Sequence, residues 1–542
     1  MRNNKRKYLL SLAGLSALIP AWNQDVRFEE EDRPNIIFIL ADDLRFDALG
    51  CIGGDEFNTP NIDKIGKQGV IFSNAYNTTA ISMASRAQIM TGLYEFSTGC
   101  NFTHGDLSYD IWESSYPYLL EKAGYNTGFA GKFGFRVMTK DGRKGNVSTV
   151  SESFDYWNGW LGQGSYSMEM NKEAEEYKKK YGDAPEHTTF ALGVSGCDFI
   201  EKYANQDQPF CLSVSFKAPH TPYHTDPRYN EVYSQTKFEE SGNHGEKESL
   251  SPQALAGRPY SKGKSWMNDY QDQMKKYNTM VYGMDVAVGM ILKELDKQGV
   301  SDNTVIIFTS DNGHFNGSKS LGGKLYAYEE GSKAPLLYYD PRLSENVNNQ
   351  NKDALIGNID MSPTILDLAG IEIPESYQGK SIIPILEGEI EENHESLMLI
   401  NVWGTRAAQS LSVVTNDFKY IYWMYGAEGY SPVEELFDMN NDQLEQKNLV
   451  NNKKYKRELE EMQSKYDDYL KFWAAKSVDG KGYPKYVKIG DRHIPFDTHS
   501  MELLKTMYPD EEKSKNKANQ DGDGKKASKN KTKTIKTKKK SK

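Results

Sequence analysis

The sequence predicts an α/β fold: a large mixed, mostly parallel sheet sandwiched by helices, followed by a small C-terminal antiparallel-sheet subdomain. Two observations predict it. Strand-like runs occur at 35–41, 125–130, 209–216 and 304–309, and the first is a continuous apolar run, as expected of a strand buried on both faces. Amphipathic helical stretches separate these runs, which is the pattern that places helices on both faces of a parallel sheet. The architecture expected is alkaline phosphatase-like.

The helices expected between the strands are short, with one exception. Short helices are predicted at 62–67, 116–123 and 353–368, and a long helix at 275–298 that ends at Gly299. Residues 138–190 and 225–270 are polar insertions, and the first contains Trp157-Asn158-Gly159-Trp160. After about residue 395 we expect short strands at 411–415 and 418–423 and a charged helix at 453–473.

Polar residues follow each of the four predicted strands. They are Asp42-Asp43, Gly131-Lys132, Ala218-Pro219-His220 and Ser310-Asp311-Asn312. Ligands of open α/β sheets bind at the carboxyl ends of the strands. The sequence therefore predicts one site that is assembled from distant segments, with the long insertions shaping its pocket.

The ends of the chain predict an exported protein. Residues 1–21 combine a basic start, a short apolar run and a small-residue cleavage site, as in a secretory signal for the bacterial periplasm or secretion. The run is too short for a transmembrane segment, and the alternative is a disordered basic terminus. We assign 22–394 to a catalytic domain and 395–512 to the C-terminal subdomain. The Lys-rich tail 513–542 is expected to be disordered, either as a solvated tail or as a weak attachment to anionic surfaces.

Charge and cysteine content narrow the functional classes. The net charge is −10 although the signal and the tail are basic, so the body of this 542-residue chain is strongly acidic. An acidic body argues against nucleic acid as its main partner. The four cysteines are scattered without metal-ligand spacing. They could pair in three ways, but we expect small buried residues.

The segment Ser82-Met83-Ala84-Ser85-Arg86 opens another predicted helix. A hydroxyl near a helix start can cap free N–H groups, and the same helix end attracts anions. Arg86 follows Ser82 by four residues, so both lie on one face of the helix. An anion at Ser82 would therefore meet a guanidinium. Taken alone, the segment also fits a plain N-cap with a solvent-facing arginine.

Oxygen donors and cations make up the rest of the candidate site. Asp42, Asp43, Asp311 and Asn312 carry oxygen ligands, and hard oxygen ligands select Ca²⁺ or Mg²⁺. Lys132 and Lys324 follow glycines in Gly131-Lys132-Phe133 and Gly322-Gly323-Lys324. His220 stands between two prolines, which restrict its loop. His224 and His314 are weaker candidates for the pocket lining.

These motifs together resemble those of the type I, formylglycine-dependent sulfatases of the alkaline phosphatase superfamily, in the bacterial Ser-type form. The resemblance rests on Ser82-x-Ala84-x-Arg86 with Thr91-Gly92-Leu93-Tyr94, and on the other motifs between residue 35 and the segment after 400. It implies a sulfuric ester hydrolase whose Ser82 is oxidised to formylglycine (3-oxoalanine) by a maturation enzyme. It also implies a sulfated carbohydrate substrate.

The resemblance assigns a role to each candidate. Ca²⁺ would be held by Asp42, Asp43, Asp311, Asn312 and the modified Ser82. Lys132 and Lys324 would contact the sulfate, and Arg86 would hold the modified residue. His220 would protonate the leaving sugar oxygen or bind the sulfate.

The sequence departs from the family at one informative position. Many sulfatases have a histidine where this chain has Gly134, and it serves as a base at the formylglycine. The segment 95–99 also lacks the usual histidines, so His104 is the candidate substitute. Two alternatives follow. A phosphoester or phosphonate hydrolase of the same superfamily is disfavoured by the absence of a His-rich zinc cluster, and a non-catalytic glycan-binding homologue is supported by Gly134.

Overall fold

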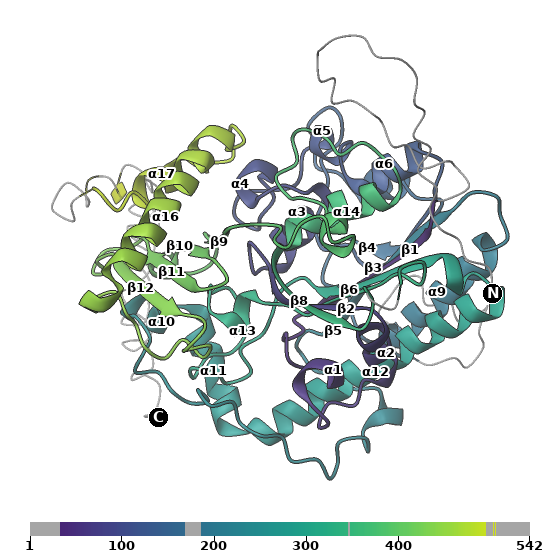
Figure 1. Cartoon of the computed structure of the whole chain (residues 1–542), viewed down its shortest axis with the longest axis horizontal. Helices are drawn as coiled ribbons and strands as arrows, with labels where there is room; N and C mark the ends of the chain where they lie inside the picture. The colour runs from purple at the N-terminus through teal and green to yellow at the C-terminus, as the bar shows by residue number, and fades with distance from the viewer. Residues whose placement is uncertain (1–32, 169–185, 345–346, 495–501, 503, 506–542) are drawn as a thin grey trace, which may run out of the picture.

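The fold is an eight-stranded sheet between two helical layers, with a four-stranded sheet beside it (Figure 1). The computed structural model describes residues 33–168, 186–344, 347–494, 502 and 504–505. The large sheet has the order β4-β3-β5-β1-β6-β7-β2-β8. Only β7 runs antiparallel to its neighbours within this sheet. The predicted fold class is therefore confirmed. The strands are β1 (Asn35–Asp42), β2 (Val70–Tyr76), β3 (Asn126–Lys132), β4 (Tyr156–Trp160), β5 (Phe210–Pro219), β6 (Thr304–Ser310), β7 (Leu336–Tyr339) and β8 (Gln350–Gly357).

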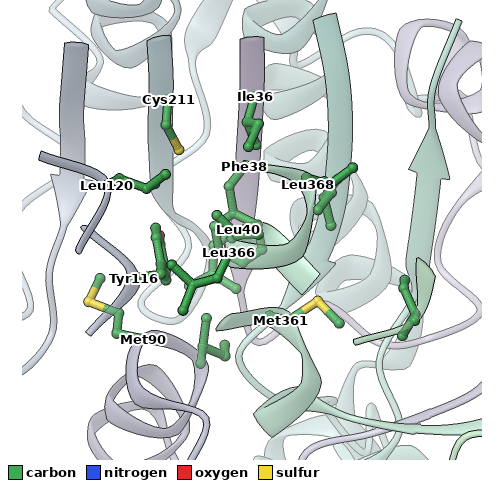
Figure 2. Packing of buried hydrophobic residues seen from close by; sticks show 14 of the residues in the cluster. Ile36, Phe38, Leu40, Met90, Tyr116, Leu120, Cys211, Met361, Leu366 and Leu368 are labelled. Carbon is green, nitrogen blue, oxygen red and sulfur yellow. The ribbon is translucent and has the colours of Figure 1, made fainter. Parts of the chain in front are cut away.

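Strand β1 lies near the middle of the sheet, and all eight of its residues are buried. Successive side chains of a strand point to opposite faces. Phe38 and Leu40 accordingly pack on one face with Tyr116 and Leu366 (Figure 2). That face is covered by α3 (Ser82–Thr91), α6 (Tyr116–Lys122) and α14 (Met361–Leu368), and the other by α2 (Pro60–Gln68), α9 (Thr188–Tyr203) and α12 (Tyr270–Gln298).

Two expected elements are wrong. Residues 353–357 belong to β8, which runs parallel to β2, and the helix begins only at Met361. The buried run Ala354-Leu355-Ile356 fits a strand buried at its end as well as a helix, so periodicity could not separate the two. Trp157–Trp160, expected in an insertion, instead lies in edge strand β4, paired with β3.

The C-terminal sheet is antiparallel, in the order β12-β11-β10-β9. Its strands are β9 (Leu397–Asn401), β10 (Ser410–Val414), β11 (Phe418–Trp423) and β12 (Val433–Asp438), and α16 (Lys456–Lys476) packs on it. The other helices are α1 (Gly50–Gly53), α4 (Glu95–Thr98), α5 (Tyr109–Trp112), α7 (Val147–Ser151), α10 (Pro252–Ala256), α11 (Arg258–Asn268), α13 (Glu329–Ser332), α15 (Ile383–Leu386) and α17 (Pro484–Ile489).

The four cysteines are free. Cys100 and Cys211 are buried as expected, whereas Cys51 and Cys197 are only partly buried. Within the described ranges, no helix is long and apolar enough to cross a membrane. The predicted signal 1–21 and tail 513–542 lie outside the described residues.

Candidate active site

The polar residues that follow the strands meet at one edge of the sheet. Asp42 is the last residue of β1, Lys132 is the last of β3, and Asp311 and Asn312 follow β6. Because β1 pairs with β6 and lies one strand away from β3, these ends are close in space. Helix α3 brings Ser82 to the same place. Asp42, Asp311 and Asn312 are fully buried.

Ser82 is the first residue of α3, and its hydroxyl does not cap the helix. Its Oγ donates to Asp42 Oδ1 over 3.1 Å and accepts from Lys324 Nζ over 3.2 Å. The capping role considered for Ser82 is therefore wrong. The hydroxyl faces a group of opposite charges, and it is 4% exposed.

Arg86 lies on the same face of α3 as Ser82, but it does not face solvent. Its Nε donates to Asp311 Oδ2 over 2.7 Å, and Nη1 donates to the Lys132 carbonyl over 2.6 Å. Its Nη2 is buried without a hydrogen bond and lies 4.0 Å from Asp42 Oδ2. Arg86 therefore ties the ends of three strands together.

Two lysines neutralise the aspartates. Lys132 Nζ lies 2.6 Å from Asp42 Oδ2, and Lys324 forms an ion pair with Asp43. Asn312 Nδ2 donates to Asp43 Oδ1 over 2.6 Å, while Asn312 Oδ1 is buried without a partner in the described part of the chain.

Burial and charge set the ionisation of this group. Burial alone would raise the pKa of Asp42, but Lys132 and the other cations hold that pKa well below its usual range. Burial is likewise outweighed at Asp43 by Lys324, and the pKa of Asp43 is about 2. Burial lowers the pKa of Lys132 to about 8. Burial and the charge of Asp42 raise the pKa of Asp311.

His220 borders the cluster. Its Nε2 lies 3.7 Å from Asp43 Oδ2, and its Nδ1 lies 2.5 Å from the Thr221 carbonyl oxygen. Burial lowers the pKa of His220. His314 is buried beside Asn316, whereas the ring of His224 stacks near Tyr166. Neither contacts Ser82 within the described residues.

Two further polar side chains reach the site, and the sequence did not predict them. Lys217 of β5 is 4% exposed; burial lowers its pKa, and the charges of Asp42 and Asp43 act on it. Gln163 Nε2 lies 3.4 Å from Asp42 Oδ2. A lysine within an apolar strand could have signalled Lys217. Nothing in the polar insertion marked Gln163.

Gly134 has a structural reason to be a glycine. Its φ is 89°, and a Cβ at this position would lie 2.5 Å from Arg86 Cδ. Any side chain here would therefore displace Arg86. His104 does not replace the missing histidine in this structure: its Nδ1 lies 2.7 Å from the Lys481 carbonyl oxygen and its Nε2 lies 3.1 Å from Tyr486 Oη. The structure places it against the C-terminal subdomain.

The donor set fits a hard divalent cation. Three carboxylates and one amide converge, and the unpartnered Asn312 Oδ1 is a buried oxygen suited to metal ligation. Ligand atoms of Asp42, Asp43 and His220 lie within 4.8 Å of one another. No thiolate belongs to that group.

Comparison with known proteins identifies the family. The sequence profile of the Sulfatase family matches residues 34–371, more than half of the chain. The chain belongs to the sulfatase family. The profile described as N-sulphoglucosamine sulphohydrolase, C-terminal, matches residues 317–471 of this sulfatase. The protein is thus a sulfuric ester hydrolase.

Curated relatives cover most of this sulfatase. An N-acetylglucosamine-6-O-sulfatase of Bacteroides thetaiotaomicron is 28% identical over 86% of this chain and 92% of its own. The human N-acetylglucosamine-6-sulfatase is 30% identical over 69% of this chain and 68% of its own. An ulvan-active sulfatase of Formosa agariphila is 26% identical over 82% of this chain and 81% of its own.

Solved structures share the fold. One, bound to D-glucosamine-2-N,6-O-disulfate as its substrate, has a TM-score of 0.65 and 25% identity, and the match covers 83% of this chain and 99% of that one. A phosphonate monoester hydrolase of Agrobacterium radiobacter has a TM-score of 0.67 at 21% identity, over 82% of this chain and 96% of that one. This second likeness shows the fold alone.

Proposed function

We propose that this sulfatase is exported, acts on sulfated glycans, and uses a formylglycine made from Ser82 by a maturation enzyme, together with Ca²⁺. The observation that carries the proposal is the position of Ser82 Oγ, which is hydrogen-bonded to both Asp42 and Lys324. A nucleophile at this point faces fixed cations and oxygen ligands at once. The names of the relatives support the glycan substrate.

The cations would bind the sulfate group. A sulfate ester is negatively charged, so preorganised positive groups stabilise the charge that develops during transfer. Lys132 pairs with Asp42, and Lys324 pairs with Asp43 and also donates to Ser82 Oγ. Arg86 fixes Asp311 and the end of β3, so its role is to hold these groups in place.

Asp42, Asp43, Asp311 and Asn312 would hold Ca²⁺ together with the modified Ser82. When bound, the ion would neutralise a sulfate oxygen and favour the ionised form of the nucleophile. The hydrated formylglycine would supply two hydroxyls on one carbon. One would attack sulfur and displace the sugar oxygen, and the other would then lose its proton so that the carbonyl re-forms as the sulfate leaves.

His220 would donate the proton to the leaving sugar oxygen. Its Nδ1 is occupied by the Thr221 carbonyl oxygen, so Nε2 is the nitrogen directed at the site. Gly134 leaves no room for the second histidine of many relatives while Arg86 holds its place.

Peptide mass spectrometry tests the nucleophile. Protein produced with an anaerobic maturation enzyme should carry Ser82 lighter by one dihydrogen, and sulfate release should scale with the converted fraction. Fully active protein with unmodified Ser82 would refute the formylglycine mechanism.

A substrate panel tests the reaction. Matured enzyme should release sulfate from sulfated sugars, and 6-sulfated N-acetylglucosamine is the first to try because two of the relatives are named for it. Faster turnover of phosphonate or phosphate monoesters would favour the alternative hydrolase. That alternative lacks a His-rich zinc cluster here, since among the described residues the one candidate metal group contains a single histidine.

A further inference from the structure

An aromatic pair made of exposed Phe102 and partly buried Trp403 lies outside the site described above. Phe102 is 57% exposed, the largest value among the exposed large hydrophobic residues of the described chain. Its ring centroid lies 5.6 Å from that of Trp403, with the planes at 50°. Phe102 follows α4 and Trp403 follows β9, so the pair joins the catalytic domain to the C-terminal subdomain. Two adjacent aromatic rings that solvent can reach offer an apolar surface on which a ligand can pack.

Positive charge accompanies the pair. The guanidinium carbon of Arg258, at the start of α11, lies 5.5 Å from the Trp403 ring centroid. Arg258 is exposed, and no carboxylate of the described residues lies within ion-pair distance of it. Arg258 therefore places a positive charge beside the Trp403 ring.

Packing connects the pair to the sulfate-binding residues. Trp403 packs against a buried cluster that contains Ile81 and Leu325, which are the neighbours of Ser82 and Lys324 in the chain. A Cβ placed on Gly404 would lie 3.8 Å from Leu325 Cδ1. With about 3.8 Å between consecutive Cα atoms, the backbones of Trp403 and Lys324 are separated by less than roughly 17 Å. A short oligosaccharide spans this distance.

We propose that Phe102, Trp403 and Arg258 form a subsite for the sugar next to the one that loses sulfate, and that this neighbouring sugar carries an acidic group. The inference rests on the proposed function. Apolar faces of sugar rings pack on aromatic side chains, which suits Phe102 and Trp403. A guanidinium pairs with a carboxylate or a sulfate through two parallel hydrogen bonds, which suits Arg258.

Trp403→Ala and Arg258→Gln test the subsite, with Ile390→Ala as the control, since Ile390 is 41% exposed and lies outside the pair. Each protein is assayed with a small aryl sulfate and with sulfated disaccharides whose second sugar is neutral, carboxylated or sulfated. Trp403→Ala should lower the ratio of disaccharide to aryl sulfate kcat/KM on the order of tenfold. Arg258→Gln should lower it for acidic second sugars and leave the neutral one unchanged, and the carboxylated and sulfated arms show which anion is bound.

The outcomes separate two failures. If wild-type protein releases no sulfate from any ester, the proposed function is wrong. If it cleaves aryl sulfate but gains nothing from a second sugar, or if Trp403→Ala lowers both activities in parallel, the subsite is wrong. An equal loss with neutral and acidic sugars in Arg258→Gln would refute the acidic preference.

Discussion

The molecule contains two buried groups of charged side chains. One residue of the first group lies only five positions before a residue of the second in the sequence. The candidate active site includes Lys324, and a second group, here called the Lys419 network, includes Glu329. This network consists of Tyr76, Glu329, Lys333, Lys419 and Glu445. Lys419 comes from β11 of the C-terminal sheet and is fully buried. Both groups bring together segments that are distant in the sequence.

The two groups differ in completeness. In the Lys419 network, Lys419 Nζ lies 2.5 Å from Glu329 Oε1 and 2.8 Å from Glu445 Oε1. The remaining Oε2 atoms accept from Lys333 Nζ and from the Glu329 backbone N–H. Every carboxylate oxygen of this network therefore has a donor within the chain. In the candidate active site, Asn312 Oδ1 lacks a donor and Arg86 Nη2 lacks an acceptor among the described residues. A closed network of this kind fixes the two sheets together, whereas an open one is suited to a ligand.

The largest effect should come from Ser82→Ala, which removes the nucleophile and leaves the Lys419 network untouched. We expect kcat on an aryl sulfate to fall by roughly 10⁴-fold or more, with little change in Tm. Steady-state assays and a thermal melt measure both quantities. Residual activity above a few per cent would mean that Ser82 is not the nucleophile.

The second-largest effect should come from removing divalent cations, which affects the candidate active site and not the Lys419 network. Chelation should reduce kcat/KM by about 10²-fold or more, because the buried carboxylates lose the ion that we propose they hold. Added Ca²⁺ should restore activity and raise the Tm of the chelated protein, since binding stabilises the folded state. A Tm that does not respond to Ca²⁺, or stoichiometric Zn²⁺ by elemental analysis, would contradict the calcium assignment.

Lys419→Met should lower stability and leave turnover unchanged, whereas Ser82→Ala should do the reverse. Lys419→Met removes the positive charge that pairs with the buried Glu329 and Glu445 carboxylates. We therefore expect the free energy of unfolding to fall by about 3–5 kcal/mol. Turnover per folded molecule should stay unchanged. Urea unfolding and an active-site-normalised assay make the comparison. Lys471→Met, which breaks an exposed pair with Asp468, serves as the control and should change neither quantity. Loss of turnover in folded Lys419→Met protein would mean that catalysis depends on the Lys419 network.

The smallest effect should be a pH dependence of stability at Glu435, which accepts hydrogen bonds from Tyr328 beside the Lys419 network. Burial raises the pKa of Glu435 to about 7. The folded protein then binds its proton more tightly than the unfolded chain, so the stability from this group is present below pH 4.5 and is lost as pH rises to 7. Glu435→Gln should therefore raise stability by about 1–3 kcal/mol at pH 8 and leave it unchanged at pH 4. Melts at both pH values test this, and an equal shift at both would exclude titration of Glu435.

The site was more predictable from sequence than the fold around it. Asp42, Asp311 and Asn312 directly follow apolar runs, so a strand and its polar end could be recognised together. Lys217 directly follows the predicted run 209–216, so the same pattern could have signalled it. Gln163 lies within an irregular insertion and carries no such mark. Its place in the site depends on tertiary packing, which local patterns do not encode.

The errors in the fold have the same origin. Residues 353–357 are as apolar as a buried helix, and only their pairing with β2 makes them a strand. His104 is the candidate substitute for the family histidine because Gly134 and the segment 95–99 lack histidines. Instead, its ring packs on Tyr483 at 4.2 Å between centroids, a contact with a segment almost four hundred residues away.

The burial of α3 has a consequence for the timing of maturation. All ten residues from Ser82 to Thr91 are buried, so an oxidising enzyme could not bind this segment in the folded protein. If Ser82 is converted, conversion must come first, while the segment is still extended and accessible. A molecule that folds before it is oxidised would retain an unmodified Ser82. The specific activity of a preparation would then record a race between oxidation and folding, and slower folding during production should yield more active enzyme.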